Sequence, residues 1–133
     1  MLKYKEICID IYRRKVILCI GEFDEFKAWA DEFLAFDENH SGLYDLIKNS
    51  KPLELGKCYI DDVADSIILI RPWNNIADLS NLVHETGHAA IGILDYLGIP
   101  INWKTDEAFT YLQEYIFKEA VTDDGYITYD KNK

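Results

Sequence analysis

The stretch DLSNLVHETGHAAIGILDYLG, residues 78–98, decides how the rest of the chain is interpreted. Its apolar residues recur three and four positions apart, which is typical of a helix with one buried face. Asp78 or Ser80 is suited to cap the start of such a helix, and Gly98 before Pro100 is suited to end it. The sequence therefore predicts one long helix over 78–98.

Two histidines and a glutamate fall on the same side of this helix. Each helical residue turns by about 100°, so an arc of about 140° contains His84, Glu85 and His88. The opposite arc is apolar and contains Leu79, Leu82, Ala89, Ala90, Ile93 and Leu94. We therefore expect His84, Glu85 and His88 to face away from the hydrophobic core.

The segment His84-Glu85-Thr86-Gly87-His88 has the pattern HExxH. Imidazoles four residues apart on a helix can bind one zinc ion, and a glutamate after the first can reach a water bound there. A solvated helix face that contains these residues by coincidence is the alternative, and the spacing argues against it because the chain has three histidines in all. We predict Zn²⁺ bound by His84 and His88, with Glu85 as general base.

Gly87 lies between the two histidines, where glycine costs about 1 kcal/mol of helix propensity relative to alanine. Close packing against a neighbouring element is the simplest reason to have a glycine there. We therefore expect another helix or strand to approach Gly87.

A catalytic zinc usually has three protein ligands and one open position. The extended metzincin pattern would need Gly at 91 and His or Asp at 94, but the chain has Ile91 and Leu94. Cys58 could supply a thiolate, but its neighbours do not match the deformylase pattern. An acidic residue from a second helix is the remaining source.

That second helix is predicted over TDEAFTYLQEYIFKEAV, residues 105–121, and offers Glu107 and Glu114 on one face. In an antiparallel pair, His88 would lie about 15 Å from the end of its helix, which is nearer the level of Glu114. Helices that cross at a large angle would remove this objection to Glu107. The spacing alone leaves both glutamates as candidates.

HETGHAAIGILDYLGIP followed by TDEAFTYLQEYI resembles the small HExxH proteins that are common in phage and prophage genomes. In those proteins the second helix has an acidic-Glu-Ala-x-x-Tyr-Leu pattern, matched here by residues 106–112. The resemblance covers about 35 residues and implies a gluzincin-type site, in which Glu107 is the third zinc ligand. Larger gluzincins often have an aspartate four residues after this glutamate, where this chain has Tyr111.

The remaining segments predict an α+β domain. A hairpin that turns at residues 13–14 would pair Ile7 with Ile20 and place Cys8 opposite Cys19. A helix is expected over 23–36, a loop over 38–42 and a short helix over 43–49. Strands are expected over 57–62 and 66–73, with a further short strand in the C-terminal tail. The predicted fold is a single minimal zincin-like domain, 1–133, with a small antiparallel or mixed sheet packed on the HExxH helix and the next helix.

Composition narrows the class of function. The formal net charge of −10 repels phosphate backbones, so nucleic-acid binding through a basic surface is not expected. No apolar run reaches the ~18 residues of a membrane helix, and no signal peptide is evident, which favours a cytoplasmic protein without membrane partners. The three cysteines are expected to be reduced and buried. The pattern defines no oligomeric state.

Two functions follow from these features. The first is a zinc metallopeptidase acting on a peptide or protein substrate, with residues 66–73 as the edge strand on which the substrate docks. His40 and Tyr111 are the candidates for stabilising the oxyanion. The second is a zincin-like protein whose metal serves binding or regulation without hydrolysis.

Overall fold

The computed structural model describes residues 1–52 and 56–133 and confirms an α+β fold. Its elements are β1 (Leu2–Ile9), β2 (Arg14–Ile20), α1 (Phe23–Phe33), the 3-10 helix η1 (Glu38–His40), α2 (Ser41–Lys48), β3 (Gly56–Ile60), β4 (Ser66–Ile70), α3 (Ile76–Tyr96), α4 (Asp106–Val121) and β5 (Ile127–Tyr129). Within this part of the chain no helix combines the length and hydrophobicity that a membrane span needs.

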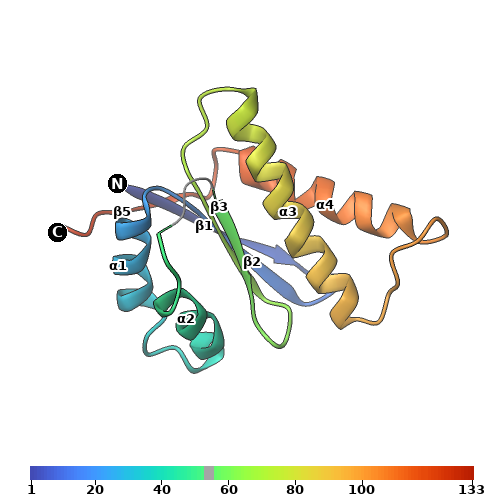
Figure 1. Cartoon of the computed structure of the whole chain (residues 1–133), viewed down its shortest axis with the longest axis horizontal. Helices are drawn as coiled ribbons and strands as arrows, with labels where there is room; N and C mark the ends of the chain where they lie inside the picture. The colour runs from blue at the N-terminus through green and yellow to red at the C-terminus, as the bar shows by residue number, and fades with distance from the viewer. Residues whose placement is uncertain (53–55) are drawn as a thin grey trace.

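The strands form one mixed sheet in the order β3-β4-β2-β1-β5. The β2–β4 pair is parallel, whereas β1–β2, β3–β4 and β1–β5 are antiparallel. A parallel pair needs a crossover connection, and here the crossover from β2 to β4 contains α1, α2 and β3. Helices α1 and α2 lie on one side of the sheet and α3 and α4 on the other (Figure 1).

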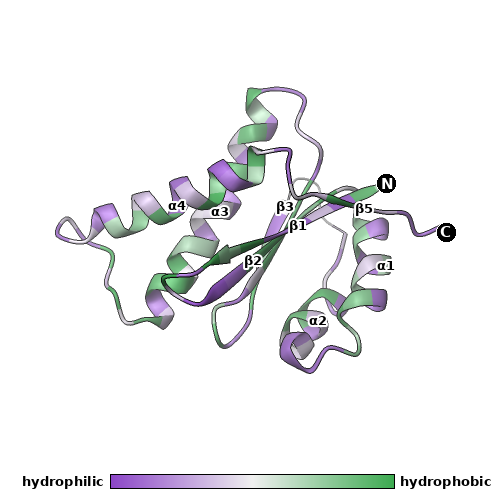
Figure 2. Cartoon of the chain, turned by 180° about the vertical axis from the view of Figure 1, so that it is seen from behind, coloured by the Kyte–Doolittle hydropathy of each residue, from purple (hydrophilic) through white to green (hydrophobic). Residues whose placement is uncertain are grey.

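The sheet is buried on both faces because neighbouring strand residues point to opposite helix layers. Leu18 and Ile68 belong to the core beneath α3 and α4, whereas Ile17 and Ile67 belong to the core with Phe26 and the other aromatic residues of α1. The helices show hydrophobic and hydrophilic residues alternating along their length (Figure 2), as expected of helices with one buried side.

The hairpin register differs from the prediction. Ile7 pairs with Val16 and Lys3 with Ile20, so Cys8 lies opposite Lys15 and not opposite Cys19. The turn occupies residues 10–13 and is closed by Arg13 at a positive φ of 54°. The expected and observed registers differ by an even number of residues, so the apolar face is the same, and only the pairing was wrong.

The cysteines are free, as predicted, but they are not all buried. Cys19 is fully enclosed in the core, Cys58 is half-buried on the α3 side of β3, and Cys8 is exposed. Cys8 is exposed because its side chain points away from the apolar face on which Ile7 and Ile9 lie.

Helix α3 begins two residues before the predicted start. Asn75 caps it, because its side-chain oxygen accepts a hydrogen bond of 2.9 Å from the backbone N–H of Asp78. The other predicted helices, the strands beginning near 57 and 66, and the short C-terminal strand all occur within a few residues of their expected positions.

The predicted edge strand was wrong. β4 lies between β3 and β2 and is buried along its whole length. β3 is the edge strand beside α3, because within the described residues it pairs with β4 alone. A continuous apolar run such as 67–70 is typical of a strand covered on both faces, which is the position that β4 has.

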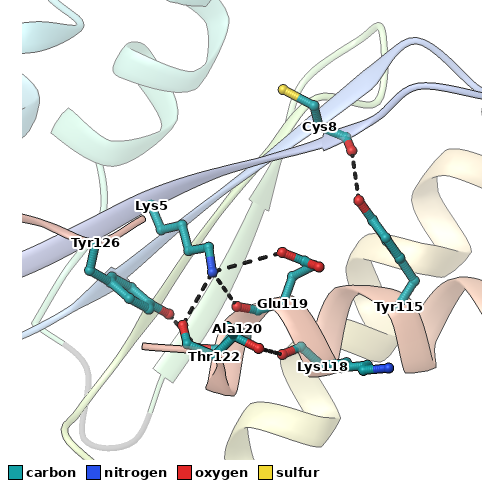
Figure 3. Close-up of polar contacts among 8 residues, drawn as sticks. All are labelled: Lys5, Cys8, Tyr115, Lys118, Glu119, Ala120, Thr122 and Tyr126. Atoms are coloured by element: carbon teal, nitrogen blue, oxygen red, sulfur yellow. Dashed lines mark hydrogen bonds and ion pairs between the residues drawn. The ribbon is translucent and has the colours of Figure 1, made fainter. Parts of the chain in front are cut away.

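The C-terminal end of α4 is held to β1 by Lys5 (Figure 3). Its buried ammonium group donates to the carbonyl oxygens of Glu119, at 2.8 Å, and Thr122, at 3.2 Å. The Glu119 carboxylate lies 3.8 Å away, and the ring of Tyr126 lies 5.3 Å from the nitrogen. These contacts satisfy carbonyl groups that the last turn of a helix leaves unpaired.

Candidate metal centre

The side chains of His84, Glu85 and His88 come together on α3. Their potential ligand atoms all lie within 4.8 Å of one another. The Nε2 atoms of His84 and His88 are 3.1 Å apart, and the ring centroids are separated by 4.7 Å. Both rings are exposed to solvent, as predicted, so the two nitrogens converge at the protein surface.

The two histidines fit a zinc ion. Nitrogen ligands about 2.0–2.1 Å from a tetrahedral zinc lie roughly 3.3 Å from each other. The 3.1 Å between Nε2 of His84 and Nε2 of His88 is close to that separation. Neutral imidazole nitrogens are also donors that zinc prefers, so both the donor type and the spacing suit the ion.

Glu85 is buried, with 6% of its surface exposed, whereas the helical arc placed it on the solvated side. The cause is β3, which covers that edge of α3. A Cβ on Gly56, the first residue of β3, would lie 3.7 Å from Cγ of Glu85. Burial raises the pKa of the Glu85 carboxyl, and the positive charges of His84, His88 and Lys57 act in the opposite direction.

Gly56 allows β3 to lie close to β4 at this point. A Cβ at this position would lie 2.9 Å from the carbonyl oxygen of Leu69 and 3.0 Å from Cδ1 of Ile70, which is too close for a real side chain. The same Cβ would be in ordinary contact with Cγ of Glu85, at 3.7 Å. The glycine therefore allows the close pairing of β3 with β4 beside the candidate base.

A pocket of about 400 Å³ adjoins the site. It is lined by Gly56, Ser80, Asn81, His84 and Glu85. Asn81 was not singled out from the sequence, although it lies three residues before His84 and so on the same side of the helix. Asn81 and Ser80 are the polar residues that line the pocket beside His84 and Glu85.

Helix α4 meets α3 at Gln113. Its Nε2 donates to the Val83 carbonyl oxygen at 3.0 Å, and it would lie 3.2 Å from a Cβ on Gly87, which confirms the close approach expected there. With a rise of about 1.5 Å per residue, Glu114 lies about 1.5 Å along α4 from Gln113, and Glu107 about 9 Å toward the connecting loop. Among the described residues, neither carboxylate belongs to the group within 4.8 Å of the histidines.

The two helices cross near this contact and separate toward the loop that joins them (Figure 1). Glu107 is in the first turn of α4, on the loop side, and its side chain is exposed. Its role as third ligand stays a prediction. Glu114, also exposed, lies nearer the level of the histidines.

Three other candidates lie away from the histidines. His40 contacts Asp37, with Nδ1 2.6 Å from the carboxylate, on the α1 side of the sheet. Tyr111 lines a hollow formed with β1. Cys58 lies beneath α3, where burial, followed by the charge of Glu85, raises its pKa to about 12. It is not in the group of described residues that could hold a metal.

Comparison with known proteins gives no match. No family profile fits the sequence, and no curated protein or solved structure is significantly similar to it.

Proposed function

We propose that this protein is a zinc-dependent peptidase in which His84 and His88 hold the metal and Glu85 is the general base. The observation that supports this most directly is the 3.1 Å separation of the two Nε2 atoms, with the Glu85 carboxylate in the same 4.8 Å cluster. A structural zinc site needs no base at this position, whereas hydrolysis does.

Zinc in such a site would polarise a peptide carbonyl and lower the pKa of a water molecule. Glu85 would take a proton from a water molecule as the water oxygen forms a bond to the carbonyl carbon. The same carboxyl group would then give the proton to the nitrogen as the C–N bond breaks.

The third ligand comes from α4 in this proposal. The resemblance to small HExxH proteins implies that Glu107 is this ligand. The contact between Gln113 and Val83 favours Glu114, because it places that part of α4 beside the histidines. The side chains of both glutamates are exposed, and Glu114 lies next to the residue that contacts α3. Asn81, in the same pocket, is our candidate for donating a hydrogen bond to the carbonyl oxygen under attack.

The free edge of β3 is the proposed docking strand for the substrate. The Asp61 N–H donates to the Asp65 carbonyl at 3.0 Å and therefore points toward β4. Successive residues of an antiparallel strand point alternately to its two sides. The backbone groups of Gly56, Cys58 and Ile60 thus face the free edge, where an extended peptide can add as a further strand.

A groove of about 660 Å³ runs beside this edge, between residues 57–62 and α2. It begins one residue after Gly56, which lines the pocket at His84 and Glu85. A peptide lying along β3 would therefore extend from this groove to the candidate metal centre. Its lining residues include Asp45, Asp61 and Asp62.

The first experiment measures zinc per chain by elemental analysis in the wild type, Glu107→Ala and Glu114→Ala. We expect about one zinc in the wild type and its loss in one of the two glutamate variants, which would identify the third ligand. His84→Asn with His88→Asn should abolish binding. No zinc in the wild type, even after it is added back, would overturn the proposal.

Glu85→Gln then separates catalysis from binding. The variant should keep its zinc but no longer cleave a mixed peptide library. Cleavage is detected by mass spectrometry of the new peptide termini. Glu85→Gln keeps the size of the side chain, so the fold and the pocket should remain. A wild-type protein that binds zinc but cleaves no peptide would support the second function.

That second function is a zinc-binding module without hydrolysis. One observation favours it: the described residues that were expected to stabilise an oxyanion, His40 and Tyr111, lie away from the histidines. The 3.1 Å between the two Nε2 atoms also suits a direct N–H···N hydrogen bond in the absence of metal. Zinc content and the Glu85→Gln variant together decide between these functions.

A further inference from the structure

A second hollow of about 470 Å³ lies between α4 and the turn that follows β1. We call it the β1–α4 hollow. One wall consists of residues 9–12, and the other consists of Ala108, Tyr111, Leu112 and Tyr115, which recur along one side of α4. None of His84, Glu85 or His88 lines it, so it is separate from the candidate metal centre. Its volume falls in the range of small-molecule sites.

Three tyrosine rings contribute to the hollow. Tyr111 and Tyr115 remain 64% and 43% exposed, although they are large aromatic residues, and Tyr12 comes from the opposite wall. The Tyr115 hydroxyl donates to the backbone oxygen of Cys8 at 3.2 Å (Figure 3), which fixes this ring across the gap between α4 and β1. Aromatic faces are therefore held open to solvent from two separate elements.

Asp10 supplies the carboxylate of this hollow. Within residues 1–52 and 56–133, no side-chain hydrogen bond or ion pair satisfies it. Of the three cations that follow it along the chain, Arg13 forms no ion pair with Asp10 among the described residues, Arg14 lies over Tyr96, and Lys15 pairs with Glu6. The charge of Asp10 therefore has no positive side chain paired with it, in a protein whose net charge is already −10.

We propose that the β1–α4 hollow binds a compact organic cation, a protonated amine or quaternary ammonium group attached to an apolar body. The rings of Tyr12, Tyr111 and Tyr115 offer π faces that attract a cation, and Asp10 offers the opposite charge. Ile9, Ala108 and Leu112 offer apolar surface to the body of the ligand. Charge complementarity distinguishes this ligand from a neutral hydrophobic one, which would not use Asp10.

The test uses benzyltrimethylammonium as the cation and benzyl alcohol as a neutral compound with the same ring. Binding is followed by NMR chemical shifts of the backbone amides of the full chain. We expect shifts over residues 9–12 and 108–115 and binding of the cation at least about threefold tighter than of the alcohol, as an exposed cation–π contact would give. Equal binding of the two compounds, or shifts centred on α3, would overturn the proposal.

Three variants make the test specific. Asp10→Asn keeps the shape of the side chain and removes its charge, and Tyr111→Leu removes one exposed ring. Each should weaken binding of the cation by about threefold, with binding of benzyl alcohol unchanged in Asp10→Asn. Asp124→Asn makes the same charge change at an exposed residue outside the hollow and should have no effect. If it weakens binding as much as Asp10→Asn, the attraction is only that of an acidic protein for cations.

Discussion

The carboxamide of Gln113 donates from Nε2 to the carbonyl oxygen of Val83, 3.0 Å away, one residue before the first histidine of the motif. The same carboxamide lies against Gly87, between the two histidines. This side chain therefore marks the level at which α4 passes the candidate metal centre. The apolar residues of α4 that pack in the same core hold the helix there as well.

Replacing Gln113 by methionine should weaken this connection. Methionine keeps most of the volume but cannot donate, so we expect a loss of about 0.5–1.5 kcal/mol in the free energy of unfolding. Urea unfolding followed by circular dichroism measures it. Thr110→Ala is the matched control on α4, because the Thr110 hydroxyl bonds only to its own helix, at Glu107. An equal loss in both variants would show that the Gln113 contact contributes nothing.

Gly56→Ala should destabilise the protein by about 1–3 kcal/mol, because a methyl group cannot be placed there without moving the backbone. The obstacle is the Leu69 carbonyl oxygen, 2.9 Å from the new Cβ. Gly42→Ala is the control: its Cβ would meet only Cβ of Asp61 at 3.7 Å. Alanine also favours the helix at position 42, so thermal unfolding should show stability unchanged or slightly raised. A neutral Gly56→Ala would contradict the account of this strand.

Lys5→Met should lower the stability by about 1–3 kcal/mol, because it leaves two carbonyl oxygens at the end of α4 without their charged donor. Those oxygens belong to Glu119 and Thr122. Hydrogen exchange should increase in residues 116–122 before the rest of α4. Lys3→Met removes a similar charge from an exposed residue of the same strand and should change little. Exchange that rises uniformly along the chain would argue against a local role for Lys5.

Alkaline pH should reduce the stability through Cys58. Its pKa is raised from 9.0 to about 12 in the folded state, first by burial and then by the charge of Glu85. The thiol is protonated in both states below pH 9, but between pH 9 and 12 the unfolded chain releases the proton while the folded one keeps it. The free energy of unfolding therefore falls over this range.

Cys58→Val should make that fall less steep, as measured by urea unfolding at several pH values. It should not abolish the fall, because the pKa of the buried Cys19 is also raised well above its ordinary value. Cys8→Val is the comparison at an exposed thiol, whose pKa is also raised, by partial burial and by Glu6. If Cys8→Val flattened the pH dependence as much as Cys58→Val, the deeper burial of Cys58 would not be the main cause.

The helices were predictable because each has apolar residues at helical spacing, over three or more turns in α1, α3 and α4 and over about two turns in α2. The hairpin register was not predictable because the turn contains no residue that requires a particular geometry, and a four-residue turn moved the pairing while keeping the faces. The position of β4 was mistaken because an apolar run such as 67–70 gives the burial of a strand but not its neighbours. Sheet order depends on contacts between segments far apart in sequence.

The candidate site also has features that the sequence predicted and features that it did not. The spacing of His84 and His88 predicts their convergence, since one helix contains both. The burial of Glu85 could not be predicted, because it depends on β3, a separate segment that packs against this side of α3. The level of α4 depends on its packing against α3, including the hydrogen bond from Gln113, and the pattern of a single helix does not reveal it.

The pairing of β1 with β5 has a consequence for synthesis on the ribosome. Leu2 lies opposite Tyr129, so almost the whole chain separates the two strands. The four other strands can assemble while residues 127–129 are still inside the exit tunnel, and β1 then has an unpaired edge. Exposed strand edges favour association between chains. We therefore expect nascent chains stalled before residue 127 to aggregate more readily than those released after it.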